Sequence, residues 1–417
     1  MRKKSTKPKA YLFQRRVTYR LYPTKAQEEI LWAWLKLHAE LYNAAIEERR
    51  TAYKTAGVSI GYVSQQNQLP EIKEIRPELV PLGSNALQST CARVDLAYAA
   101  FFRRLKAGET PGYPRFKSWR RFKGWTWPSK SGWKLETKEN SRKATLHIPT
   151  LGDIRARGLP RQTGVPATLT ITRKRGIWEA SVVLNISKAD REHGEERLAF
   201  DWGLETFLTM SDGSTVDNPR LLKKQLKVLK KAQKDLDRKK RGSNNRDKAK
   251  EVVTKLYRDV TNARKDFLHK ESAILIARSG FLATETLDTE SMVESEHASC
   301  DLRRSILDGS PAAFNSMVRY KAEEAGTALS EIETREAKPS QRCPECFALC
   351  GKKPLSQRTH RCPHCGHAEG RDLAAARVIL QWAEGRRPPG GGPAEIAEET
   401  APVRRETPCL ARSASMR

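Results

Sequence analysis

Three carboxylates that each adjoin an apolar segment constrain the fold of this chain more than any other feature. Asp201 ends one apolar, strand-like run, Glu285 ends a second, and Asp372 opens an alanine-rich helix predicted over 373–382. An ionised group at the edge of a core is costly without a partner. One such acid alone says little, since most acidic residues are exposed or cap helices. Three of them can meet around a divalent cation, which compensates their mutual repulsion.

Half of the eight cysteines form two Cys-x-x-Cys pairs on either side of residues 347–361. The four are Cys343, Cys346, Cys362 and Cys365. Two such pairs can close a tetrahedral zinc shell, and four protein thiolates leave no open position, so the sequence predicts a structural zinc. The alternatives are unrelated buried cysteines, or a redox pair, which needs one such motif near a βαβ unit. Cys350, His364 and His367 are spare ligands nearby, for which we expect a solvent-facing or outer role.

The charge of the chain indicates a polyanionic partner. The formal net charge is +28 and the pI is about 9.9. Each Lys or Arg placed on a phosphate releases condensed counterions, which favours nucleic acid as the partner. No apolar run is long enough to predict a membrane span, and no apolar signal core follows the basic start of the chain. Together with the scattered remaining cysteines, this predicts a cytoplasmic, nucleoid-associated protein.

The first half of the chain is predicted to combine a helical domain with short strands. Alternation over 17–22 predicts a strand, Thr24 and Gln27 fit a capping box, and apolar spacing predicts helices after Thr24 and over 84–106. Residues 103–134 hold ten Lys or Arg, one acid and four tryptophans. Either these tryptophans stack on bases, or they are strand core. Strand patterns continue to about residue 190 and suggest a small barrel or meander.

The second half is predicted to hold a hairpin, a basic helical pair and a tail. A strand hairpin should follow Asp201, with its turn at Asp212 and Gly213. Leucines recur over 221–241 and apolar residues over 249–268, which predicts a basic helical hairpin. It is either a nucleic-acid surface, which we favour, or a solvated face. The composition of 386–417 predicts a disordered tail.

Taken together, these motifs resemble those of TnpB, the transposon-encoded RNA-guided endonuclease family related to type V CRISPR effectors. Besides the three acids and the cysteines, the resemblance rests on residues 19–24 with Gln27, Tyr42-Asn43, residues 112–117 and Ser340-Gln341. The chain departs from the family pattern at four positions. Phe347, Gly370, Ala374 and Pro311 stand where the family has a glycine, an acid, an asparagine and a tryptophan.

The resemblance implies a multidomain α+β fold, with a RuvC-like α/β nuclease domain of ribonuclease H type. The implied parts are a wedge β-barrel (1–22 and 116–190), an inserted helical recognition domain (23–115), the nuclease domain with its basic hairpin (191–342 and 366–385), a zinc ribbon (343–365) and the tail (386–417).

The resemblance also implies a function. The protein would hold a guide RNA from the transposon end, as a monomer in the RNA-bound complex. It would cut double-stranded DNA beside a short flanking motif, using two Mg²⁺ ions on Asp201, Glu285 and Asp372. The flanking motif would be read by Tyr53, Asn85 and Gln88. The alternative for Gln88, on a helix with an apolar face, is a solvated or capping role. Two alternatives stay open: a nuclease-inactive RNA-guided repressor, and an unguided zinc-ribbon DNA-binding transposase accessory.

Overall fold

The structure is a computed structural model with a mixed α/β fold. It describes residues 13–388, apart from 130–131, 139–140, 160–163, 175, 187–191, 296–297 and 355. The chain forms two compact units. The first contains residues up to 193, 220–277 and 316–326, and the second contains 194–219, 278–315 and the chain from 327 onward. Most of the predicted tail lies outside the described residues.

The first unit is built on a seven-stranded antiparallel sheet in the order β2-β6-β7-β1-β5-β4-β3. Its strands are β1 (Phe13–Tyr22), β2 (Gly124–Trp127), β3 (Lys134–Thr137), β4 (Lys143–Ile148), β5 (Gly152–Arg157), β6 (Val165–Lys174) and β7 (Ile177–Ile186). The predicted strand over 17–22 is therefore confirmed and longer. Because β2 and β3 are the two edges of the hydrogen-bonded order, closure into a barrel stays a prediction.

The tryptophan-rich segment contributes mainly to the core of this unit. Trp125, Trp127 and Trp133 are 0%, 4% and 1% exposed, and alternate residues of β7 such as Trp178 are buried beside them. The core interpretation is therefore right for these three rings. Trp125 and Trp127 alternate along β2, so their side chains line one face of the sheet. Trp119, in the short helix η2 (Trp119–Arg121), is 37% exposed.

Helices cover this sheet. The long helix α1 (Lys25–Ala56) begins at the predicted capping box, in which the Gln27 amide donates to Thr24 Oγ1 and the Thr24 amide to Gln27 Oε1. Gln27 Nε2 also donates to the carbonyls of Leu151 and Asp153, which ties the start of α1 to β5. α4 (Ser84–Lys106) packs on α1 and β2. Between them lie α2 (Tyr62–Asn67), α3 (Leu69–Ile75) and η1 (Pro77–Leu82).

The predicted helical hairpin is confirmed as α5 (Leu221–Asp237) and α6 (Asn244–Arg278). Arg246 Nη1 donates to the carbonyls of Leu236 and Lys239 and so satisfies backbone acceptors at the C-terminal end of α5. A fully buried lysine, Lys321 of α9 (Pro311–Ala325), donates to the His269 carbonyl and to Ser272 Oγ, at 2.6 Å each. These bonds join α9 to α6 and satisfy a charge that would otherwise be costly to bury.

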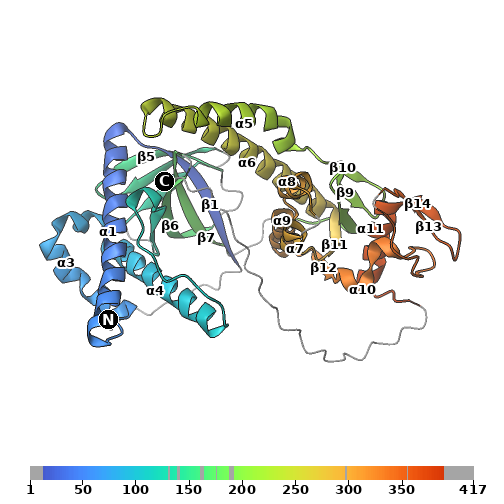
Figure 1. Ribbon diagram of the computed structural model, residues 1–417, viewed down its shortest axis with the longest axis horizontal. Helices are drawn as coiled ribbons and strands as arrows, with labels where there is room; N and C mark the ends of the chain where they lie inside the picture. Colours follow the sequence, from blue (N-terminus) through green and yellow to red (C-terminus); the bar gives the residue numbers. More distant parts are fainter. Residues whose placement is uncertain are drawn as a thin grey trace. The chain divides into compact units, whose positions relative to one another are not determined.

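The second unit is built on a five-stranded sheet in the order β10-β9-β8-β11-β12 (Figure 1). Its strands are β8 (Glu196–Trp202), β9 (Thr206–Met210), β10 (Thr215–Asp217), β11 (Ser279–Glu285) and β12 (Ala328–Ile332). β8, β11 and β12 run parallel, and β8 pairs with β9 in the antiparallel sense. β9 and β10 form the predicted hairpin, with its turn at Asp212 and Gly213. α11 (Arg371–Ala383) packs on this sheet over small residues such as Ala199 and Ala283, which let the helix approach closely.

The remaining elements of the second unit are short. They are α7 (Thr289–Glu294), α8 (Cys300–Gly309), α10 (Thr334–Ala337), η3 (Pro339–Gln341) and the strand pair β13 (Thr359–Arg361) and β14 (Ala368–Gly370). Within the part of the chain that the structure describes, no helix has both the length and the apolar character to span a bilayer.

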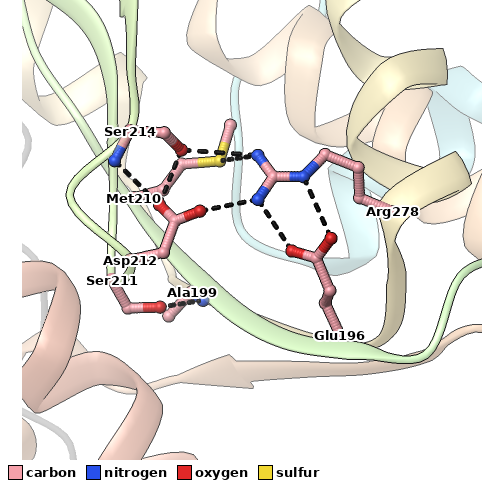
Figure 2. A network of polar contacts seen from close by, with 7 residues as sticks. All are labelled: Glu196, Ala199, Met210, Ser211, Asp212, Ser214 and Arg278. Carbon is pink, nitrogen blue, oxygen red and sulfur yellow. Dashed lines mark hydrogen bonds and ion pairs between the residues drawn. The ribbon is translucent and has the colours of Figure 1, made fainter.

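The Arg278 guanidinium links acidic side chains at the end of the second sheet where β8 and β11 begin (Figure 2). Arg278, the last residue of α6, donates to Glu196 Oε2 at 2.7 Å and to Asp212 Oδ2 at 2.6 Å. Asp212 also accepts from the amide and hydroxyl of Ser214. Burial alone would raise the pKa of Asp212, but the hydrogen bonds from Ser214 and Arg278 outweigh it and lower that pKa. Arg278 thus holds the start of β8 and the β9–β10 turn together.

Replacing Arg278 with Gln should loosen the β9–β10 hairpin. We expect a local loss of about 0.5–1 kcal/mol at neutral pH, because the partners are partly exposed. Faster hydrogen exchange of the β9 and β10 amides would report it. Since the pKa of Asp212 is lowered in the folded state, ionised Asp212 stabilises the fold at neutral pH. This contribution is lost as the pH falls below 3.8, the ordinary pKa of an aspartate, and through the lower pKa of the folded state. The difference from wild type should therefore shrink in acid; a difference that is equal at pH 3 and pH 7 would contradict this role.

Candidate metal centres

The register of the second sheet places two of the three predicted acids side by side. Phe200 of β8 is paired with Thr284 of the parallel strand β11, so Asp201 and Glu285, the next residues, lie level at the same edge. Each side chain is half-buried. The third acid, Asp372, lies in the first turn of α11, which packs against β8 and β11. Segments far apart in the sequence thus converge at one edge because parallel strands end there.

The pKa of Asp201 depends on the two other acids. Burial raises the pKa of Asp201 well above its usual value, and the charges of Glu285 and Asp372 raise it further. The Trp202 backbone amide and the Arg371 guanidinium oppose this shift. Burial also raises the pKa of Glu285. Carboxylate oxygens that repel one another in a partly desolvated site are the donor set that a hard divalent cation requires, so these residues fit such an ion.

Two residues near these acids were not identified from the sequence. A hydrogen bond from Thr334, at the start of α10, lowers the pKa of Glu285 against the effect of burial, and its hydroxyl also contacts the Thr286 carbonyl. Arg371 is anchored by its side chain on the Pro354 carbonyl at 2.9 Å. The position of Arg371 next to Asp372 could have drawn attention to it. Nothing in the sequence marks Thr334, whose position depends on the turn after β12.

The four predicted cysteines form the second centre. Cys343, Cys346, Cys362 and Cys365 are the one group of three or more possible ligands, among the described residues, whose ligand atoms all lie within 4.8 Å of one another. The Sγ atoms of Cys346 and Cys362 are 3.5 Å apart and those of Cys343 and Cys365 are 3.7 Å apart. Zn–S bonds of about 2.3 Å in a tetrahedron imply sulfur separations of about 3.8 Å. The donor set therefore fits a zinc ion.

The spare ligands near this cluster behave differently from one another. Cys350 is half-buried, and its Sγ lies 3.6 Å from Cys362 Sγ, closer than a solvent-facing role suggests. His364 Nε2 lies 3.3 Å from the Leu349 carbonyl oxygen. His367 pairs with Glu369 at 3.2 Å. The two histidines thus lie beside groups outside the cysteine cluster.

The structure gives a physical reason for the unusual Phe347. Its φ of 63° is left-handed, a conformation that favours glycine, which is the residue the family has there. The ring is 1% exposed and stacks on Trp382 of α11, with centroids 6.2 Å apart. The guanidinium carbons of Arg342 and Arg386 lie 5.1 Å and 4.8 Å from the ring centroid. This stack, which we call the knuckle clamp, offsets the backbone strain and fixes the first cysteine pair to α11.

A second set of bonds strengthens the knuckle clamp. Arg386 donates to the carbonyls of Pro344 and Glu345, between the first two cysteines. Arg342 Nη1 donates to the Phe347 carbonyl at 2.7 Å. Because Asp372 lies in the first turn of α11, the helix that the clamp fixes is also the helix that carries the third acid.

The residues predicted to read flanking DNA all lie in the first unit. Tyr53, near the end of α1, is 67% exposed. Asn85 and Gln88 are half-buried on the first two turns of α4, and Asn85 Nδ2 donates to Ser129 Oγ at 3.0 Å. Their role as readers stays a prediction.

Comparisons with known proteins give consistent results. A family profile described as "Probable transposase" matches residues 181–296, and a profile described as "Cas12f1-like, TNB domain" matches 312–379. A "Helix-turn-helix domain" profile matches 13–57, where the structure has β1 and the single helix α1.

Two curated relatives match most of the chain. A "Putative RNA-guided DNA endonuclease" of Streptomyces pristinaespiralis is 30% identical over 371 residues, which cover 88% of this chain and 89% of the relative. The "Putative RNA-guided DNA endonuclease InsQ" of Escherichia coli K12 is 27% identical, with 87% of this chain and 92% of the relative covered. A "TnpB-like protein" of Acanthamoeba polyphaga mimivirus is 22% identical over 91% of this chain and 75% of its own length.

Solved structures also match. One is that of the mini-RNA-guided endonuclease CRISPR-Cas_phi3, with 9% identity, a TM-score of 0.48, and coverage of 89% of this chain and 93% of the other. Another is a Cas12f1–sgRNA–target DNA complex, with 15% identity, a TM-score of 0.32, and coverage of 88% and 99%.

Replacing Asp201 with Asn should stabilise the protein in the absence of divalent cations. The change removes one charge from a site where burial and two other acids raise its pKa. A raised pKa means that the folded state binds more protons than the unfolded state, so wild type loses stability as the pH rises from acid to neutral. Thermal unfolding in EDTA should therefore show a higher Tm for the variant at pH 8, by about 2–4 °C for each kcal/mol that the variant gains in unfolding free energy. The gain in Tm should be smaller at pH 5. A variant less stable than wild type at pH 8 would contradict the clustering of the acids.

Freshly purified protein should contain one tightly held zinc ion per chain. Elemental analysis of Cys362→Ser should show most of it lost, because a buried thiolate ligand is removed and metal binding is coupled to local folding. Cys91→Ser is the matched control, since Cys91 is a buried cysteine of the first unit, and it should keep its zinc. Wild-type protein without zinc would refute this centre.

Proposed function

Because the chain belongs to the TnpB family, we propose that it is a transposon-encoded RNA-guided DNA endonuclease that cuts by metal-dependent phosphodiester hydrolysis. The observation that carries the proposal is the convergence of Asp201, Glu285 and Asp372 at one sheet edge, where burial and the charges of the other two acids raise the pKa of Asp201. A site built only for stability would gain from replacing these acids. Their retention argues for cation binding, and it disfavours a nuclease-inactive repressor.

We propose that the three carboxylates hold two Mg²⁺ ions. When bound, such ions generate a nucleophile from water and stabilise the oxygen that leaves in an in-line displacement. Asp201 on the central strand β8, Glu285 at the end of β11 and Asp372 on α11 would together hold the ions. Thr334 restrains Glu285 by a hydrogen bond, and the Arg371 charge offsets part of the repulsion at Asp201. Hard oxygen ligands select Mg²⁺ over softer metals.

The proposed partners are a guide RNA from the transposon end and a double-stranded DNA target. Base pairing between guide and target would read sequence, so the protein needs a large basic surface more than a base-reading motif. The exposed lysines of α5 and α6 and the cations of 103–134 supply such a surface. We propose that the RNA-bound complex contains one copy of the chain.

We further propose how the parts of the chain divide this work. Residues 1–22 and 116–190 would form the wedge domain, 23–115 the recognition domain, and 191–342 with 366–385 a RuvC-like nuclease around the ribbon at 343–365. The sheet order of the second unit, with α11 on its face, supports the nuclease assignment. Tyr53, Asn85 and Gln88 would read the flanking DNA, since the side-chain amides of Asn and Gln can form two hydrogen bonds with one edge of an adenine.

Alanine at Asp201, Glu285 or Asp372 should abolish cleavage and leave RNA binding intact. Loss of a metal ligand removes several kcal/mol of transition-state stabilisation, or roughly a 10²–10⁴-fold fall in rate. The assay is cleavage of a plasmid library by the purified RNA-bound protein, with sequencing of the bound RNA. Glu294→Ala, an exposed acid on α7, is the control and should cut normally. Wild-type cutting by any one of the three variants would refute the assignment of that acid. Absence of a defined RNA would refute guidance.

A further inference from the structure

The first unit carries a cluster of aromatic rings at the margin of its core. Its rings come from α4 and from the segment 107–118 that follows it, and one arginine of α1 lies against them. The members of this aromatic cluster are Arg50, Tyr98, Phe101, Phe102, Tyr113 and Phe116. Neighbouring ring centroids are 5.2 Å apart for Phe101–Tyr113 and for Phe101–Phe102, and 5.6 Å apart for Tyr98–Tyr113.

Three rings of the aromatic cluster face solvent to an unusual degree. Phe102, Tyr113 and Phe116 are 52%, 40% and 48% exposed, whereas Tyr98 beneath them is 8% exposed. Large apolar rings gathered at a surface cost hydration free energy and mark interaction sites. The cluster is therefore a platform whose base is buried and whose top is free in the described structure.

The platform is held in place by specific bonds. Asn43 of α1 accepts from the Lys117 amide at 2.8 Å and donates to the Lys117 carbonyl at 3.0 Å, so it pins the segment that carries Tyr113 and Phe116. The hydroxyls of Tyr98 and Tyr113 lie 3.1 Å apart. Rings that are fixed before binding lose little conformational entropy when a ligand stacks on them.

The charge around the cluster indicates the class of ligand. Residues 103–117 contain five Lys or Arg and one acid, Glu109, which is paired with Arg104. The Arg50 guanidinium carbon lies 4.8 Å and 4.9 Å from the centroids of Tyr113 and Phe116. Aromatic faces beside arginines, within a strip in which cations outnumber acids, are features that suit single-stranded nucleic acids. An apolar protein partner would not need this excess of cations.

We propose that the aromatic cluster stacks unpaired bases of a single-stranded nucleic-acid segment, while the cations of 103–117 contact its phosphates. This inference rests on the proposed function, since a guided nuclease handles single strands of both RNA and DNA. Stacking is tolerant of sequence because every base presents a flat face. The cluster thus adds affinity without adding specificity.

The test compares two fluorescein-labelled oligonucleotides of equal length and charge, oligo(dT) and a fully abasic strand. Full-length protein, freed of RNA in high salt, should bind the base-bearing strand more tightly. Phe116→Leu keeps apolar bulk but removes the ring, and should lower affinity for oligo(dT) about 10-fold without changing affinity for the abasic strand. Phe116→Tyr keeps the ring and should behave as wild type. Phe102→Leu provides an independent second position.

A charge variant separates stacking from phosphate contact. Arg115→Gln should weaken both strands equally and reduce the slope of log K against log salt by about 0.7, whereas Phe116→Leu should leave that slope unchanged. Equal binding of both strands by wild type, or an equal loss for both strands in Phe116→Leu, would overturn the proposal. These outcomes do not depend on cleavage or on guide RNA, so failure of the proposed function would be seen separately, as a lack of cutting with stacking intact.

Discussion

The repulsion among three half-buried carboxylates is the constraint on which the second unit depends. β8 and β11 run parallel, which leaves Asp201 and Glu285 level at one sheet edge, and α11 adds Asp372. Such a site is unfavourable without a cation, because burial and like charges both oppose ionisation. The surroundings limit that cost only in part, through Thr334 at Glu285 and the Arg371 charge near Asp201. The remaining cost is what a bound divalent cation would offset.

The segment 343–365, which carries the four cysteines, has a mechanical role in this arrangement. The knuckle clamp attaches the first cysteine pair to the end of α11 through Phe347 and Trp382, while Arg371 ties the start of α11 to the loop at Pro354. Both ends of α11, the helix that carries Asp372, are therefore fixed to the segment 343–365. A glycine at position 347 would relieve the left-handed backbone but would lose the stack, so this chain accepts local strain in exchange for packing.

The sequence was most informative where a local signal has a direct structural cause. The capping box at Thr24 and Gln27, the two cysteine pairs and the strand end at Glu285 lie as predicted, since each depends on neighbouring residues. β8 extends one residue beyond Asp201. The tryptophans at 125, 127 and 133 could not be assigned, because an apolar ring beside cations fits a core and a stacking surface equally well. The roles of Thr334, Arg278 and the knuckle clamp depend on contacts between residues distant in sequence, which no periodicity reveals.

The most direct test of the central claim is to locate the metal. Crystals of the RNA-bound protein soaked in Mn²⁺, which takes the same oxygen ligands as Mg²⁺ and scatters anomalously, would place the ions without any assay of cutting. We expect anomalous peaks bounded by the carboxylates of Asp201, Glu285 and Asp372, and their loss in Asp201→Asn. Peaks elsewhere, with these three side chains turned apart, would contradict it.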